Sequence, residues 1–299
     1  MGSSGRTCRH PPLVKPDGWV FLNLSLNAGF RSVHRCCASN SVQETGMGIP
    51  NLFILGAGKS GTTTLYHLLK RHPDIHVCDP KEPSFFCSHF QVVKDPISYF
   101  NLFNSDRRYR LDASHVYFSN PETPPILYDL FPKAKFILIL RHPKARAHAL
   151  YQHMRRSIHR DGRPLELCES FHESLALEEL RFNSPEFASS CRQYFWNFMY
   201  MRSSIYDMQI LRYKKFYSDD QFLILTLAEL QNQPDVVRSK LALFLDLEVG
   251  TFFEDIPVSN AAPAYAPFSS ICDALMEDHF KDLTHRVDAM VGRSLDWSL

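Results

Sequence analysis

A single lysine lies in a run of small residues where the sequence predicts a change from strand to helix. Residues 56–63 read GAGKSGTT; they follow the apolar run 52–55, and the apolar spacing of a helix begins at Thr62. Unpaired N–H groups and the positive dipole end of a helix start attract anions, and glycines let a phosphate approach the backbone. We therefore predict a phosphate-binding loop in which Lys59 adds a positive charge and the neighbouring hydroxyl groups add hydrogen bonds.

This loop alone leaves the kind of phosphate site open. The loop of nucleotide triphosphatases reads GxxxxGK[ST]. Gly58, Lys59 and Ser60 fit its end, but its first glycine would fall on Phe53. A P-loop nucleotide kinase is one alternative, and a glycine-rich turn without any ligand is another.

A charged pair lies between two prolines shortly after this loop. Residues 79–83 read DPKEP, and two phenylalanines follow at positions 85 and 86. The prolines stiffen a loop that carries Lys81 and Glu82. Loops at the carboxyl ends of parallel strands gather at one edge of a sheet, so we expect Glu82 near the phosphate-binding loop. The alternative is a solvated acid without a chemical role.

A second anion site is predicted where the apolar run 134–140 ends at Arg141, followed by His142 and Pro143. A kinase-type nucleotidase would be expected to have an aspartate at this point to hold Mg²⁺. A guanidinium before a helix that begins with proline suits a phosphate instead. Two phosphate positions without a magnesium carboxylate favour a nucleotide whose transferred group needs no metal, and we predict no metal site.

The elements that must position these residues predict an α/β fold. The 299 residues are 44% hydrophobic and 22% charged, enough for one large core. Strands are expected at 49–55, 75–78, from Arg110, at 134–140 and at 222–227. Helices are expected from Thr62 to Pro73, at 90–110, 119–131, from Pro143, and at 165–180, 195–216, 230–245 and 271–291. Together they predict one domain with a central parallel sheet flanked by helices on both faces.

The remaining composition limits partners and location. A net charge of +1 gives no reason to expect nucleic-acid binding. The eight cysteines show no metal-type spacing, so buried thiols are expected, with one disulfide as the alternative. Residues 1–48 are predicted to be a poorly structured leader before a domain at 49–299. The apolar stretch 19–30 is too short to span a membrane, so we expect no membrane anchor and a soluble chain.

In order and spacing, these segments resemble the carbohydrate sulfotransferases that use 3′-phosphoadenosine 5′-phosphosulfate. The resemblance covers about residues 49–298 and is closest to the glycosaminoglycan branch, which includes heparan sulfate glucosaminyl enzymes. It rests on segments at 53–63, 81–86, 111–114, 136–146 and 291–297. The resemblance implies the P-loop-like sulfotransferase fold and, for location, the Golgi lumen, with the cytoplasm as the alternative.

The resemblance also implies a mechanism. The family transfers a sulfuryl group in line from the phosphosulfate to a sugar hydroxyl or amine, without a metal. Glu82 would be the general base and Lys59 would neutralise charge on the sulfuryl group and the bridging oxygen. Arg141 would pair with the 3′-phosphate. The residues that would hold the 5′-phosphate are Lys59, Ser60, Gly61, Thr62 and Thr63.

The acceptor is predicted to be an anionic or neutral polysaccharide, such as a glycosaminoglycan. The residues expected to bind it are Lys81, Asp112, Gln152, Arg155 and Arg156. The last three belong to a basic stretch at 151–163, which suits a cleft lip for a polyanion. A solvated basic helix end is the alternative.

Two departures from the family concern the far end of the nucleotide. Ala149 stands where the family has a serine that binds the 3′-phosphate, and either Arg146 or His148 could compensate. Residues 258–265 carry no basic residue where the family has a Lys-Gly-Arg loop. We therefore expect weaker nucleotide affinity or a different lid. A catalytically weakened, sugar-binding relative is a further alternative.

Overall fold

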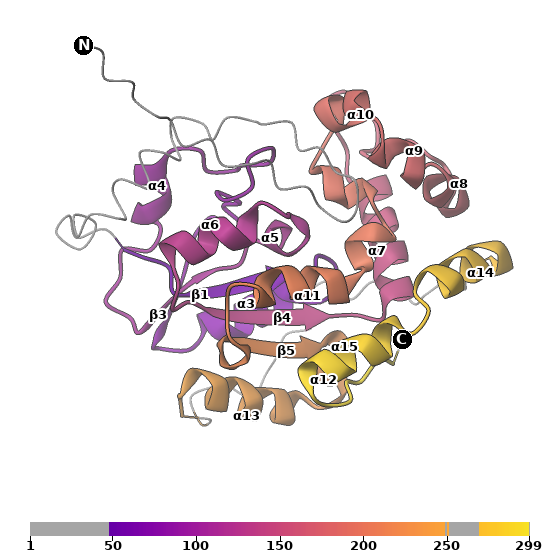
Figure 1. Cartoon of the computed structure of the whole chain (residues 1–299). Helices are drawn as coiled ribbons and strands as arrows, with labels where there is room; N and C mark the ends of the chain where they lie inside the picture. The colour runs from indigo at the N-terminus through magenta and orange to yellow at the C-terminus, as the bar shows by residue number, and fades with distance from the viewer. Residues whose placement is uncertain (1–47, 249, 251–268, 299) are drawn as a thin grey trace, which may run out of the picture.

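A sheet of five parallel strands forms the centre of the molecule (Figure 1). The computed structural model describes residues 48–248, 250 and 269–298. The leader, apart from Gly48, and the loop 258–265 therefore lie outside the described residues, and the domain boundary at 48/49 stays a prediction. The strands are β1 (Leu52–Gly56), β2 (Ile75–Val77), β3 (Tyr109–Asp112), β4 (Lys135–Leu140) and β5 (Phe222–Thr226). Their order is β2-β3-β1-β4-β5, which confirms the predicted strands and the parallel α/β class.

The central strands β1 and β4 are almost entirely apolar because both faces of the sheet are covered. Alternate residues of a strand point to opposite faces. In β1, Phe53 belongs to a core rich in aromatic side chains, whereas Ile54 belongs to an aliphatic core on the other face. In β4, Phe136 and Ile137 divide in the same way.

Helices form the two outer layers (Figure 1). The aliphatic face is covered by α3 (Thr62–Lys70) and α13 (Pro234–Leu245), and the aromatic face by α5 (Val116–Ser119), α6 (Thr123–Leu130), α7 (Pro143–Arg156) and α11 (Tyr206–Lys214). The other helices are α4 (Pro96–Asn101), α8 (Phe171–Ala176), α9 (Glu178–Phe182), α10 (Pro185–Ser190), α12 (Leu227–Asn232), α14 (Ser270–His279) and α15 (Leu283–Val291). Short 3-10 turns occur at Phe195–Phe198, Arg202–Ser204 and Asp219–Gln221.

Two of the predicted long helices are wrong. Helix 165–180 does not begin until Phe171, because the buried Glu166 side chain forms a two-bond ion pair with Arg181 and also accepts a hydrogen bond from Tyr200. The chain then turns at Leu177, so that α8 and α9 are separate. Of the predicted helix 195–216, α11 is the only α-helical part, since the preceding residues form two 3-10 turns.

Four further helices differ from prediction at identifiable residues. Pro234 separates α12 from α13, where a single helix 230–245 was expected. Asp282, at φ 55°, separates α14 from α15 in the predicted helix 271–291. In the predicted helix 90–110, only α4 is helical; Pro96 begins it and the Asp95 carboxylate caps it. The helix expected from 119 begins at Thr123, after the unpredicted α5.

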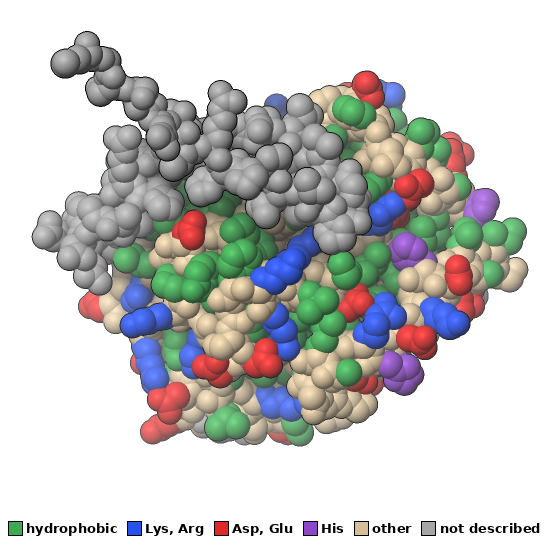
Figure 2. Space-filling model, in the orientation of Figure 1, with side chains coloured by type: hydrophobic (Ala, Val, Ile, Leu, Met, Phe, Trp, Pro, Cys, Tyr) green, Lys and Arg blue, Asp and Glu red, His purple; other side chains and the backbone are tan. Residues whose placement is uncertain are grey.

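Charged side chains of both signs are spread over the face seen in Figure 2, while apolar side chains gather over α6 and α11. The exposed apolar residues of these two helices and the turn after α11 are Tyr128, Met208, Leu211 and Phe216. In the described part of the chain, no helix is both long enough and apolar enough to cross a membrane.

Candidate active site

The predicted phosphate-binding loop connects β1 in the middle of the sheet to the start of α3. Gly61 is the N-cap residue, in the left-handed region at φ 95°; it offers no side-chain cap, and the first turn of α3 contains no acid. The positive end of α3 is therefore not capped by an acid, as an anion site requires. Thr62 is buried and Thr63 is half-buried at this helix start. Lys59 itself has a positive φ of 70°.

A buried arginine fixes the loop from the opposite side. Arg146, on α7, donates from Nε to the carbonyl of Gly58 at 3.1 Å. Its Nη1 donates to the hydroxyl groups of Ser203 at 2.8 Å and Ser204 at 2.7 Å. Burial lowers the pKa of Arg146 from an ordinary value near 12.5. Arg146 thus stabilises the loop, and the idea that it replaces the missing phosphate serine is not supported by these contacts.

Arg141 lies at the end of β4, beside the same loop. Its Nη1 is 3.5 Å from the carbonyl oxygen of Lys59, at the limit of a hydrogen bond. The hydroxyl of Tyr206 donates to the Arg141 carbonyl at 2.8 Å and fixes this strand end. Ser60 is fully buried, and its Oγ makes no hydrogen bond of good geometry within the described structure. A buried hydroxyl of this kind suits a site that receives a polar ligand.

Glu82 is held in an unusual backbone conformation. Both Glu82, at φ 64°, and Ser84, at φ 52°, lie in the left-handed region, which costs energy for residues other than glycine. The Ser84 N–H donates to Ser114 Oγ at 2.9 Å, which ties this loop to the end of β3. The Glu82 carboxylate contacts the Lys81 ammonium through Oε1 and lies 3.0 Å from His115 Nδ1 through Oε2.

These contacts keep Glu82 ionised. Burial by itself would raise the pKa of Glu82, but the charge and hydrogen bond of His115, and then those of Lys81, hold it well below its usual range. Burial lowers the pKa of Lys59, Arg156 lowers it further, and Glu82 opposes them. Lys59, Glu82 and Arg156 therefore lie close enough to affect one another's charge.

Two histidines of this cluster were not predicted as site residues. His115 follows β3, and His153 lies on α7, three residues before Arg156. The pKa of His153 falls to about 4 because of burial and the nearby charges of Lys59, His115 and Arg156. The signal for His115 was its place after a predicted strand, at the sheet edge that also holds the phosphate-binding loop. For His153 the signal was its position three residues before Arg156 on a predicted helix, because residues at that spacing lie on the same helix face.

Asp112 does not line the site surface. Its carboxylate is fully buried and accepts hydrogen bonds from Tyr99 at 2.8 Å, Tyr117 at 3.0 Å and the Ser114 hydroxyl at 2.6 Å. Burial raises its pKa to about 6, although these bonds oppose the shift. Asp112 therefore supports Ser114, which in turn holds the Glu82 loop. Its predicted contact with an acceptor does not fit this burial.

The basic residues expected to bind the acceptor have different surroundings. Arg155 donates to the carbonyl of Glu166 at 3.0 Å and so fixes the chain after α7. Gln152 Nε2 lies 3.3 Å from His148 Nε2. Arg156, on the last turn of α7, donates to the Gln152 carbonyl at 3.2 Å and has its charge near Lys59. Binding of an acceptor by these three residues stays a prediction, as it does for Lys81.

The sulfotransferase domain family matches residues 50–260 of the sequence. The chain belongs to the sulfotransferase family. The alternative of a P-loop nucleotide kinase is therefore wrong, and the fold is the P-loop-like fold of sulfotransferases. A solved sulfotransferase from Alicyclobacillus acidocaldarius is 28% identical, with a TM-score of 0.68 over 83% of this chain and 98% of that one. A mouse sulfotransferase solved with PAP shares the fold at 14% identity and a TM-score of 0.52, over 85% of this chain and 91% of that one.

Curated relatives of this sulfotransferase include enzymes of heparan sulfate. The bifunctional heparan sulfate N-deacetylase/N-sulfotransferase 1 of Caenorhabditis elegans is 26% identical over 72% of this chain, and the human protein of that name is 29% identical over 69%. The chain spans 24% and 23% of the length of these two relatives. The membrane-associated sulfotransferase kil1 of Dictyostelium discoideum is 22% identical over 83% of this chain and 66% of its own length.

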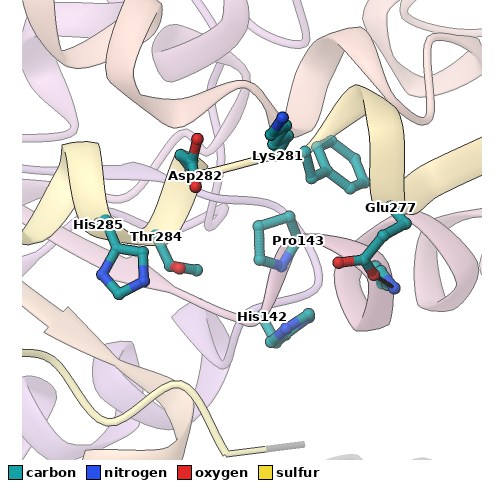
Figure 3. Close-up of a pocket in the computed structure, with 9 residues that line it drawn as sticks. His142, Pro143, Glu277, Lys281, Asp282, Thr284 and His285 are labelled. Atoms are coloured by element: carbon teal, nitrogen blue, oxygen red, sulfur yellow. Dashed lines mark hydrogen bonds and ion pairs between the residues drawn. The ribbon is translucent and has the colours of Figure 1, made fainter.

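A separate cavity of about 400 Å³ lies where the start of α7 meets α14 and α15 (Figure 3). His142 and Pro143 contribute one side, and Glu277, Thr284 and His285 come from the C-terminal helices. No predicted site residue lines this cavity. Nearby, the ammonium of Lys144 is occupied by Asp273, at 2.9 Å, and by Glu277. We therefore locate the candidate active site at the phosphate-binding loop.

Proposed function

We propose that this sulfotransferase transfers a sulfuryl group from 3′-phosphoadenosine 5′-phosphosulfate to a hydroxyl or amine of a carbohydrate, with a glycosaminoglycan-like polysaccharide as the acceptor. The observation that carries the proposal is the cluster of an ionised Glu82 and a half-buried Lys59 beside a helix start that has no acid in its first turn. A base, a positive charge and an anion site are the three parts that such a transfer needs.

The residues present fit the phosphosulfate. Lys59, Ser60 and Gly61 would hold the 5′-phosphate together with Thr62 and Thr63 at the start of α3, where the Ser60 hydroxyl still lacks a partner of good geometry. Arg141 would hold the 3′-phosphate from the end of β4. When bound, the nucleotide supplies the activated sulfuryl group, and no protein group has to form a covalent bond.

The chemistry of the chain itself is proton removal and charge neutralisation. Glu82 accepts the proton that the attacking hydroxyl or amine loses as its bond to sulfur forms. Lys59 neutralises the negative charge on the oxygen that leaves with the 5′-phosphate as the old sulfur–oxygen bond breaks. Because its pKa is low, Glu82 is ionised and ready to accept at neutral pH. A reaction without a metal stays part of this proposal.

The acceptor class rests on charge and on relatives. Arg156 and Lys81 place positive charge around Lys59, and Lys81 also contacts Glu82. Guanidinium groups bind carboxylates and sulfates in pairs of hydrogen bonds. The relatives named for heparan sulfate support an anionic polysaccharide. A location in the Golgi lumen is proposed on the same family grounds.

A catalytically weakened, sugar-binding protein is the second candidate. It is favoured by Ala149, whose buried methyl group offers no hydrogen bond on the helix that follows Arg141. The retained pair of Glu82 and Lys59 favours the enzyme.

The deciding experiment offers labelled phosphosulfate and a panel of glycans to the protein and to Glu82→Gln. We expect label to be transferred to an anionic glycan by the wild type, with at least a hundredfold loss in Glu82→Gln, as for removal of a general base. Calorimetry with adenosine 3′,5′-bisphosphate provides the binding control, because both proteins should bind it equally. Absence of nucleotide binding at millimolar concentration would contradict the proposal, while binding without transfer to any glycan would favour the second candidate.

A further inference from the structure

His115 links the Glu82 carboxylate to the phosphate-binding loop. Its Nδ1 lies 3.0 Å from Glu82 Oε2. On its other side the ring lies against Gly58: a Cβ added at Gly58 would come within 2.6 Å of His115 Cδ2. The imidazole therefore fills the space between the base and the loop, and Gly58 is the residue type that leaves room for it.

Among the described residues, His115 supplies the side-chain hydrogen bond that ties Glu82 to another element of the fold. The other polar contact, with Lys81, comes from the neighbouring residue in the same loop and moves with it. Because Glu82 has a left-handed backbone and belongs to no helix or strand, its position depends on contacts of this kind.

His115 itself is firmly placed. It follows Ser114, whose N–H and hydroxyl both donate to the buried carboxylate of Asp112. It also caps the start of α5, and its carbonyl oxygen lies 3.1 Å from where a Cβ on Gly56 would stand. The end of β3 thus holds the Glu82 loop twice, once through Ser114 at the Ser84 N–H and once through His115 at the carboxylate.

We propose that His115 is a positioning residue for the reaction, which fixes the Glu82 carboxylate beside the phosphate-binding loop. The inference rests on the proposed function. An ionised carboxylate can only accept hydrogen bonds, so Nδ1 carries the proton and donates it in either charge state of the ring. Each carboxylate oxygen has two lone-pair directions. The bonds from His115 and Lys81 therefore leave room for the acceptor's proton.

The first test uses two substitutions that separate the loss of the imidazole ring from the loss of its hydrogen bond to Glu82. His115→Ala removes the donor, whereas the amide nitrogen of His115→Asn can take the place of Nδ1. We expect His115→Ala to lower kcat about 10- to 100-fold, the effect of losing a hydrogen bond to a charged group, with adenosine 3′,5′-bisphosphate binding unchanged. His115→Asn should recover most of the loss. His172→Ala, at an exposed position on α8, is the matched control. Equal losses in both His115 variants would overturn the proposal.

A double variant tests whether His115 acts through Glu82. In the Glu82→Gln background, His115→Ala should cause little further loss of kcat, because the group that it positions is already absent. Losses that multiply would show an independent role and overturn the inference. This comparison also holds if His115→Ala is less stable, because the double variant has the same destabilisation.

The pH profile gives a readout that a purely structural role would not move. The titratable and charged groups around Glu82 are Lys81 in its own loop, His115 after β3, Lys59 after β1, and His153 and Arg156 on α7. Burial raises the pKa of Glu82, and the nearby positive groups lower it. Removal of His115 leaves fewer such groups, so the pKa of Glu82 rises. The acid limb of kcat/KM should then move to higher pH in His115→Ala, and by a smaller amount in His115→Asn, which keeps the hydrogen bond but not the charge. An unchanged acid limb in His115→Ala would refute the proposal.

A spectroscopic test remains if the proposed function fails. If wild-type protein transfers no sulfate to any glycan, the function is wrong, but the contact can still be read from the imidazole ¹⁵N resonances. The Nδ1 resonance of His115 should shift in Glu82→Gln, with that of His172 unchanged. A His115 resonance that does not respond would overturn the inference independently of any activity.

Discussion

Replacing Arg146 by methionine should weaken both the fold and nucleotide binding. Methionine has a similar length but offers no donor, so the Gly58 carbonyl and the hydroxyls of Ser203 and Ser204 lose the hydrogen bonds that Arg146 gives them. At about 1.5 kcal/mol for each bond from a charged donor, the loss is about 4.5 kcal/mol. Since the guanidinium no longer has to be desolvated, we expect a net destabilisation of about 2–4 kcal/mol. This corresponds to a fall in Tm of roughly 4–16 °C.

The same change should lower the affinity for adenosine 3′,5′-bisphosphate about tenfold or more, because the loop that holds the 5′-phosphate loses its fixed carbonyl. Thermal unfolding with and without the nucleotide measures both effects, and calorimetry gives the affinity directly. Arg146→Lys keeps the positive charge but lacks the fork of guanidinium donors. Its stability and nucleotide affinity should therefore lie between those of the wild type and those of Arg146→Met. Arg160→Met, at an exposed site, is the control. A stability loss with unchanged affinity would refute the argument that Arg146 positions the loop.

Three further predictions concern separate parts of the site. Gly58→Ala should reduce nucleotide affinity about tenfold through its clash with the His115 ring, and adding His115→Ala should restore it; calorimetry would detect a failure of this rescue. Arg156→Ala should raise KM for a polyanionic acceptor in a salt-dependent way while the nucleotide Kd is constant, so an unchanged KM would exclude an acceptor role. Because the folded pKa of Asp112 is raised to about 6, its contribution to stability is lost as pH rises from about 4 through 6. Unfolding of the wild type against Asp112→Asn should show this slope, and parallel pH curves would contradict it.

The sheet and the positions of the two segments proposed to bind anions were predictable because their signals are local. Buried parallel strands are continuous apolar runs, and a glycine-rich turn before a helix can be recognised from a few consecutive residues. The same holds for Arg141 at the end of β4. The order of these segments along the chain resembles that of a known family, and this resemblance gave the predicted reaction class. The comparison with the sulfotransferase family supports that class.

The parts that could not be predicted depend on contacts between distant segments. His115 and Glu82 are far apart in sequence, and no pattern around either indicates that they pair. Asp112 was expected at the acceptor, but only its contacts with Tyr99 and Tyr117 reveal that it is buried. The late start of the predicted helix 165–180 has a similar origin, since Glu166 pairs with Arg181.

The central place of β1 divides the active site between two neighbours. On one side β3 carries the supports of the base; on the other, β4 ends in the arginine proposed for the 3′-phosphate, and the phosphate-binding loop is shared by both. Because the segment after β3 holds the Glu82 loop and none of the proposed nucleotide contacts, we expect substitutions there to change acceptor preference at constant affinity for the nucleotide. With this arrangement, relatives could use one sulfate donor with different acceptors. Changes in the segment after β3 need not alter the proposed nucleotide contact after β4.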